Sequence, residues 1–129
     1  MALKLSPRTT NGVLVINCSG RIVFGDEATQ LRELVKRELS GNNRIVLNLA
    51  DVSYIDSGGI GTLVSLFTSA RSAGGDIKLA NLTKRVGDLL QITKLITVFE
   101  SYDDEHKAID AFGSAARGAS PAASRRETA

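Results

Sequence analysis

Residues 44–67 read RIVLNLADVSYIDSGGIGTLVSLF and contain, in order, an apolar run, a short acidic loop and a second apolar segment. The first run, residues 45–49, is interrupted only by Asn48, so apolar and polar residues hardly alternate. Such a run is typical of a parallel strand that is covered on both faces. Val52 to Ile55 continue this apolar character as far as Asp56.

A helix is expected to begin at about Ser57 to Gly59. Asp and Ser are common at helix N-termini, and glycine lets the backbone approach another group closely. The apolar residues that follow have the spacing of one helical face, with Gly61 expected on the same side where it would allow tight packing. They are Ile60, Leu63, Val64 and Phe67.

The loop between this strand and helix is the candidate functional site. It lies at the carboxyl end of a strand and opens onto unpaired backbone N–H groups at the positive end of a helix dipole, which suits an anion. A glycine-rich connection of this kind can also lack any function. The functional interpretation is favoured here because Asp56 stands directly beside the Ser57 hydroxyl.

The run Asp51-Val-Ser-Tyr-Ile-Asp-Ser-Gly-Gly-Ile-Gly61 resembles the signature of STAS domains, in particular of the small bacterial anti-sigma factor antagonists. In that family the pattern is D-L-S-x-V-x-[YF]-[IML]-D-S-[ST]-G-[LI]-G, followed by an amphipathic helix. The resemblance spans about residues 3–112. It implies an α/β fold in which a mixed sheet, an antiparallel N-terminal hairpin plus parallel strands, packs with about four helices. Residues 1–112 would form the STAS domain and residues 113–129, which are small and polar, a disordered tail.

The resemblance also implies a function. Family members bind an anti-sigma factor that is a serine kinase of the GHKL type and so release a sigma factor; phosphorylation of the loop hydroxyl ends the binding, and a PP2C-type phosphatase restores it. Carried onto this chain, the acceptor is Ser57, and the partner-binding loop comprises Asp56, Ser57, Gly58, Gly59, Ile60 and Gly61.

One position departs from the family pattern. A second hydroxyl residue usually precedes the glycine, whereas this chain has Gly58 there. If the usual acceptor corresponds to Gly58, the protein is permanently active or responds by another route. Thr62 and Ser53 are lesser candidates, expected as helix and turn hydroxyls.

Composition and charge exclude several classes of protein. The chain has 129 residues with a net charge of +2, from 16 basic and 14 acidic side chains, and part of the excess is Arg117, Arg125 and Arg126 near the C-terminus. This is not the basic patch of a nucleic-acid-binding protein. No apolar run approaches the roughly 18 residues of a membrane span, and the N-terminus lacks the apolar core of a secretory signal. A cytoplasmic protein is therefore expected, and the sequence leaves open whether it is a monomer or a weak dimer.

An enzyme is not expected. Ser57 and Asp56 have no evident His or Lys beside them to serve as a base. Cys18 is the single cysteine and is predicted to be a buried, inert thiol. Asp103, Asp104 and Glu105 are predicted to stabilise a helix N-terminus rather than bind a metal, and no cofactor is implied.

The remaining elements are predicted from periodicity and turn signals. Asn11-Gly12 is a strong hairpin signal, and Thr83 is expected to cap a helix. The other expected strands are 3–8, 13–18, 76–82 and 98–99, and the other expected helices are 27–39, 84–90 and 105–112. A turn is expected at 19–21, and the helix that begins at about Ser57 to Gly59 is expected to end at about Ala73.

Two other functions remain open on this sequence. One is a STAS module that senses a nucleotide or small anion at the same helix end. The other is a scaffold subunit of a stress-signalling complex. A sensor would bind its ligand without a protein partner, and a scaffold would form an assembly that is indifferent to charge in the loop.

Overall fold

The computed structural model describes residues 3–95 and 97–116, with side chains to Phe112. Within them lie five strands and four helices. Their bounds are β1 Lys4–Thr10, β2 Val13–Ile22, α1 Asp26–Leu39, β3 Arg44–Ile55, α2 Ser57–Ser72, β4 Asp76–Ala80, α3 Lys84–Ile92, β5 Glu100–Tyr102 and α4 Glu105–Ala116. The expected α/β fold with a mixed sheet and four helices is confirmed.

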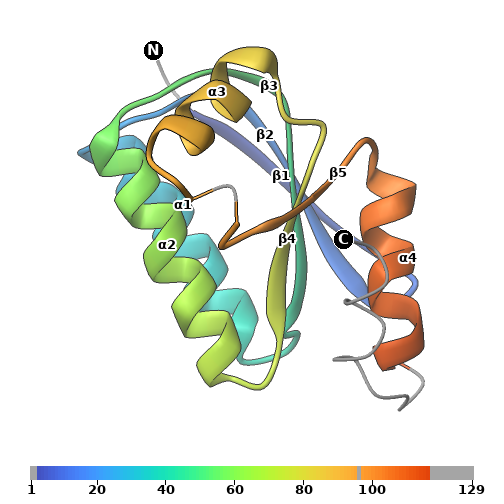
Figure 1. The fold of residues 1–129 in the computed structure, drawn as a ribbon. Helices are drawn as coiled ribbons and strands as arrows, with labels where there is room; N and C mark the ends of the chain where they lie inside the picture. The colour runs from blue at the N-terminus through green and yellow to red at the C-terminus, as the bar shows by residue number, and fades with distance from the viewer. Residues whose placement is uncertain (1–2, 96, 117–129) are drawn as a thin grey trace.

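The sheet follows the chain, in the order β1-β2-β3-β4-β5 (Figure 1). Strands β1 and β2 are antiparallel, and all later neighbours are parallel. Asn11 and Gly12 form the hairpin turn with φ of 53° and 78°, the positive angles that a type I′ turn requires. Pro7 lies on β1 at the edge of the sheet, where a missing N–H is tolerated.

Helices cover both faces of the sheet. Figure 1 shows α1 and α2 side by side on one face and α4 on the opposite face. Ile45 and Leu47 of β3 belong to the larger apolar cluster with α1, α2 and α3, whereas Val46 packs with Phe112 of α4. The lack of alternation in residues 45–49 therefore reflects a strand buried on both sides, as expected.

Strand β2 is longer than expected. Ser19, Gly20 and Arg21 were expected to form a turn, but they continue β2 and pair with β3. The register shifts between Asn17 and Ser19 and again between Gly20 and Arg21, and Gly20 has a φ of 118°. Glycine inside a strand often marks such a bulge, which local sequence does not distinguish from a turn.

The last strand was misplaced by the prediction. The backbone N–H groups of Val98 and Phe99 donate to the carbonyl of Leu95 at 2.9 and 3.4 Å, so they form a turn, and pairing with β4 begins at Glu100. Phe99 is instead a buried core residue whose ring lies edge-on to Phe67, with 5.2 Å between centroids.

The bounds of several other elements also differ from the prediction, and β1 runs from Lys4 to Thr10 rather than over residues 3–8. Strand β4 ends at Ala80 rather than at Leu82, and α3 continues to Ile92. Helix α4 continues to Ala116, past the domain boundary expected after Phe112. Residues 117–129 of the expected tail lie outside the described residues.

Charged side chains lie on the face of the sheet that α4 covers. Lys78 of β4 is 2% exposed, and its ammonium pairs with Asp76 at 3.3 Å and with Glu100. The same nitrogen lies 4.8 Å from the centroid of the Phe112 ring. A buried charge needs such partners, so Lys78 links β4, β5 and α4.

A second polar cluster surrounds Glu105 at the start of α4. Its carboxylate accepts hydrogen bonds from Asn48 at 2.5 Å, from Asn17 at 3.4 Å and from Arg8. Asp104 rather than Glu105 accepts from the backbone of the first turn, at Lys107 N–H. Burial alone would raise the pKa of Glu105, but the hydrogen bonds from Asn48, Arg8 and Asn17 and the charge of Arg8 together lower it.

The lowered pKa of Glu105 predicts a pH-dependent contribution to stability. A carboxyl whose folded pKa is below its unfolded value stabilises the fold above the unfolded pKa, and the contribution is lost as the pH falls through the folded pKa. Glu105→Gln should therefore lower the free energy of unfolding at pH 7 by about 1 kcal/mol and by less at pH 3. Urea unfolding at both pH values measures this. Asp110→Asn, at an exposed acid of the same helix, is the control, and an equal loss for Glu105→Gln at both pH values would contradict the prediction.

Candidate functional site

The candidate site lies where two loops meet at the carboxyl ends of β2 and β3. One loop, residues 23–25, connects β2 to α1, and the other is the junction of β3 and α2 at Asp56. Helices α1 and α2 begin at the same end of the sheet, as Figure 1 shows. The N–H of Asp56 donates to the carbonyl of Ile22 at 3.4 Å, which ties the two connections together.

The Asp56 carboxylate joins both loops. It caps α2 by accepting the N–H of Gly59 at 2.7 Å. It also accepts the N–H of Phe24, with Oδ1 at 3.1 Å and Oδ2 at 3.2 Å. Capping by a carboxylate satisfies a helix N–H and places negative charge where the dipole favours it. Asp56 thus holds the start of α2 against the β2–α1 loop.

Ser57 is the first helical residue and is exposed. The sequence allowed either Asp56 or Ser57 to cap the helix, and because Asp56 does so, the Ser57 hydroxyl is left over. Within the described part of the chain it makes no hydrogen bond. The hydroxyl is therefore open to solvent or to another protein.

The three glycines of this loop differ in their surroundings. A Cβ on Gly59 would lie 1.9 Å from the backbone oxygen of Ile22, and one on Gly58 would lie 2.5 Å from Cβ of Phe24. A Cβ on Gly61 would meet nothing within 4 Å. The expectation that Gly61 allows tight packing is therefore wrong, because that residue faces away from the core, whereas Ile60 beside it is buried.

The other hydroxyls considered from sequence are already engaged. Thr62 is buried, donates to the carbonyl of Gly58 at 3.0 Å and lies 3.4 Å from a guanidinium nitrogen of Arg32. Ser53 lies within β3 rather than in a turn, and its hydroxyl donates to the carbonyl of Gly20 at 3.2 Å.

The exposed ring of Phe24 is a feature of the site that was not predicted from the sequence. Its side chain is 81% exposed although it follows a buried strand and stands next to the Ser57 loop. The available signal was an aromatic residue immediately before Gly25, whose φ of 109° turns the chain. An isolated aromatic in a loop has no periodicity, so its exposure could not be predicted.

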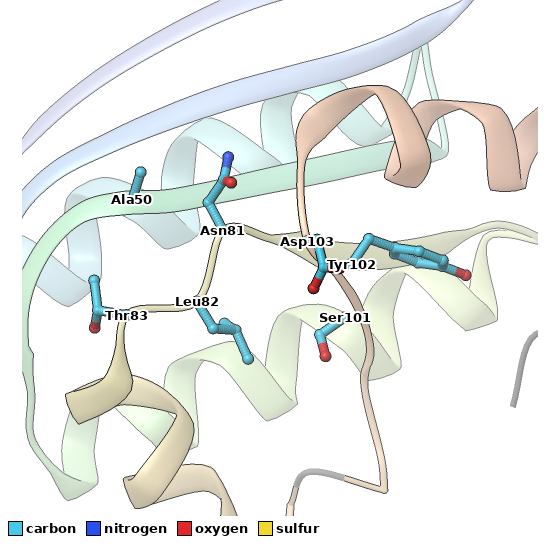
Figure 2. Close-up of a pocket in the computed structure, with 7 residues that line it drawn as sticks. All are labelled: Ala50, Asn81, Leu82, Thr83, Ser101, Tyr102 and Asp103. Carbon is cyan, nitrogen blue, oxygen red and sulfur yellow. The ribbon is translucent and has the colours of Figure 1, made fainter.

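A depression of about 420 Å³ lies apart from this loop (Figure 2). Its lining comprises Ala50, Asn81, Leu82, Thr83, Ser101, Tyr102 and Asp103. The lining contains an acid and no Lys or Arg, and Figure 2 shows the Tyr102 ring turned away from Ala50 and Thr83. This chemistry does not favour a nucleotide phosphate.

The remaining reactive groups do not form a second centre. Cys18 is buried, and burial raises its pKa to about 12, so the thiol stays protonated and inert at neutral pH. Across the described residues, no three His, Cys, Asp or Glu side chains are grouped to hold a metal ion. None of the helices described there is long and apolar enough to cross a membrane.

Comparison with known proteins gives the class to which this chain belongs. The STAS domain family model matches residues 4–108, so the chain belongs to the STAS domain family. It is 30% identical over 101 residues to the anti-sigma-B factor antagonist of Bacillus subtilis strain 168, covering 78% of this chain and 91% of that protein.

Two further proteins, both from Thermotoga, are similar. A Thermotoga neapolitana protein is 37% identical over 70 residues, which are 54% of this chain and 62% of that relative, so the chain spans less than two thirds of its length. A solved Thermotoga maritima structure matches with a TM-score of 0.77 and 27% identity, covering 82% of this chain and 92% of the other.

Proposed function

We propose that this protein is an anti-sigma factor antagonist of the bacterial cytoplasm, which binds an anti-sigma factor and so releases a sigma factor. The partner would be a serine kinase of the GHKL type, Ser57 its phosphorylation site and a PP2C-type phosphatase the enzyme that reverses the modification. The antagonist itself needs no catalytic group, metal or cofactor for this role, and it does not contact nucleic acid.

One observation carries the proposal: the exposed, unbonded hydroxyl of Ser57 at the first position of α2. A kinase needs a hydroxyl that it can reach without unfolding its substrate, and Thr62 is buried. Membership of the STAS family and the similarity to the Bacillus subtilis anti-sigma-B factor antagonist support the same role.

The proposed switch acts by local electrostatics. A phosphate would add about −1.5 to −2 charges beside Asp56 and Gly58. The start of α2 tolerates an anion because its N–H groups and dipole favour one, so the antagonist stays folded. Binding is lost because the charge and bulk fall at the centre of the contact with the partner.

The residue assignment is tested by phosphorylation. The full chain is used to capture its partner from the source cell, and the purified partner is incubated with ATP and either wild type, Ser57→Ala or Ser65→Ala. Ser65 is an exposed serine of the same helix and provides the control. We expect a kinase to be captured and to label wild type and Ser65→Ala but not Ser57→Ala. Label that persists in Ser57→Ala would remove Ser57 from the role.

The two alternative functions predict other results. A sensor of nucleotide or anion would bind its ligand in the absence of any protein, which calorimetry with nucleotides or phosphate would detect. A scaffold subunit would be recovered in a stable assembly from which Ser57→Asp does not release it. The depression of Figure 2, with Asp103 and no cation, gives the sensor no support.

A further inference from the structure

The ring of Phe24 is the most exposed large apolar side chain of the described residues, at 81%, followed by Ile92 at 75%. Leaving an aromatic ring in water is unfavourable, since full burial of such a side chain is worth about 1.5–3 kcal/mol. Phe24 packs into neither apolar cluster of the fold. Its ring therefore contributes little to the core and is available to another protein.

The position of Phe24 is nevertheless fixed. Its backbone N–H is held by both oxygens of Asp56. Its Cβ lies so close to Gly58 that any side chain at that position would have to displace it, since the two Cβ atoms would be 2.5 Å apart. A backbone that is already restrained loses little conformational entropy on binding, so the cost that remains is the ordering of the ring.

Both groups that restrain Phe24 flank Ser57. Asp56 precedes the serine and Gly58 follows it, so residue 24 is held against the backbone on both sides of Ser57. Phe24 also has exposed polar residues near it in the chain, Arg21 and Asp26. A central aromatic with a polar surround is the usual composition of a binding hot spot.

We propose that Phe24 is the apolar anchor of the complex with the anti-sigma factor, which would receive its ring in an apolar pocket beside the contact with Ser57. Gly58 then leaves the space in which residue 24 is held. Its lack of a side chain is required for binding, in addition to removing the hydroxyl that the family pattern has at this position. This inference rests on the function proposed above and names a hot spot of that complex.

The first test compares Phe24→Ala with Ile92→Ala, a similarly exposed apolar residue on α3. Each full-length variant is titrated into the anti-sigma factor captured by the wild-type chain. Phe24→Ala should weaken binding by about 30-fold or more, as expected for a hot spot, with an unchanged melting temperature, and Ile92→Ala should bind like wild type. If wild type binds and Phe24→Ala binds equally well, the anchor is overturned and the proposed function stands. If wild type captures no anti-sigma factor, the proposed function fails, and the anchor with it.

A second test addresses Gly58 through a double-mutant cycle. Gly58→Ala should displace residue 24 and weaken binding at least 10-fold when Phe24 is present, but have less than a threefold effect in the Phe24→Ala background. Such non-additivity is expected of residues that act through one contact. If Gly58→Ala lowers the affinity equally in both backgrounds, Gly58 acts independently of the ring, and its proposed role in positioning Phe24 is overturned.

Discussion

Replacing Gly59 by alanine is expected to lower the free energy of unfolding by about 3 kcal/mol or more, at the upper end of the effects of overpacking. The new Cβ would stand 1.9 Å from the carbonyl oxygen of Ile22 and 2.8 Å from its carbon. These are backbone atoms of β2, which cannot rotate away as the end of a flexible side chain can. The start of α2 would have to move off the sheet, and the hydrogen bond between Gly59 and Asp56 would be strained with it.

Gly61→Ala provides the matched control in the same helix. A Cβ there meets nothing within 4 Å, and alanine favours a helix over glycine by about 0.5–1 kcal/mol. Urea unfolding followed by circular dichroism should thus show Gly61→Ala to be more stable than wild type and Gly59→Ala to be far less stable. A difference of less than about 1 kcal/mol between the two variants would contradict the close packing of Gly59 against β2.

These glycines also illustrate what the sequence could predict. The pattern Asp-Ser-Gly-Gly placed the helix start within two residues, because capping preferences are local. It could not tell Gly59 from Gly61, since only the first faces β2, and that contact joins residues far apart in the chain. Sequence reasoning therefore assigned close packing to both and was right only for Gly59.

Long-range contacts also explain the other differences. Lys78 gives no local sign of burial, because its partners Glu100 and Phe112 come from elements that follow it. The prediction of a strand at Val98 and Phe99 used their β propensity. In the structure both N–H groups donate to the carbonyl of Leu95 and form a turn. The apolar Phe99 therefore packs in the core instead of pairing with β4.

Ser57→Asp is expected to weaken binding to the anti-sigma factor by about 10² to 10⁴, or 3 to 5 kcal/mol. Ser57 is exposed beside Phe24, so a fixed negative charge there must be desolvated when the partner closes over this surface, and burial of an unpaired charge is costly. Ser57→Ala removes only a hydroxyl that makes no hydrogen bond within the described residues, and it should bind within about threefold of wild type.

The loss must come from the interface and not from unfolding. Aspartate at the first position of α2 interacts favourably with the helix dipole by about 0.3–1 kcal/mol, so the melting temperature of Ser57→Asp should equal or exceed that of wild type. Ser65→Asp adds the same charge to an exposed position of the same helix and controls for net charge. Calorimetric titration of the three variants separates the outcomes. A loss confined to Ser57→Asp indicates a charge switch at this hydroxyl, an equal loss for Ser65→Asp indicates a general charge effect, and an unchanged affinity for Ser57→Asp would leave Ser57 without a switching role.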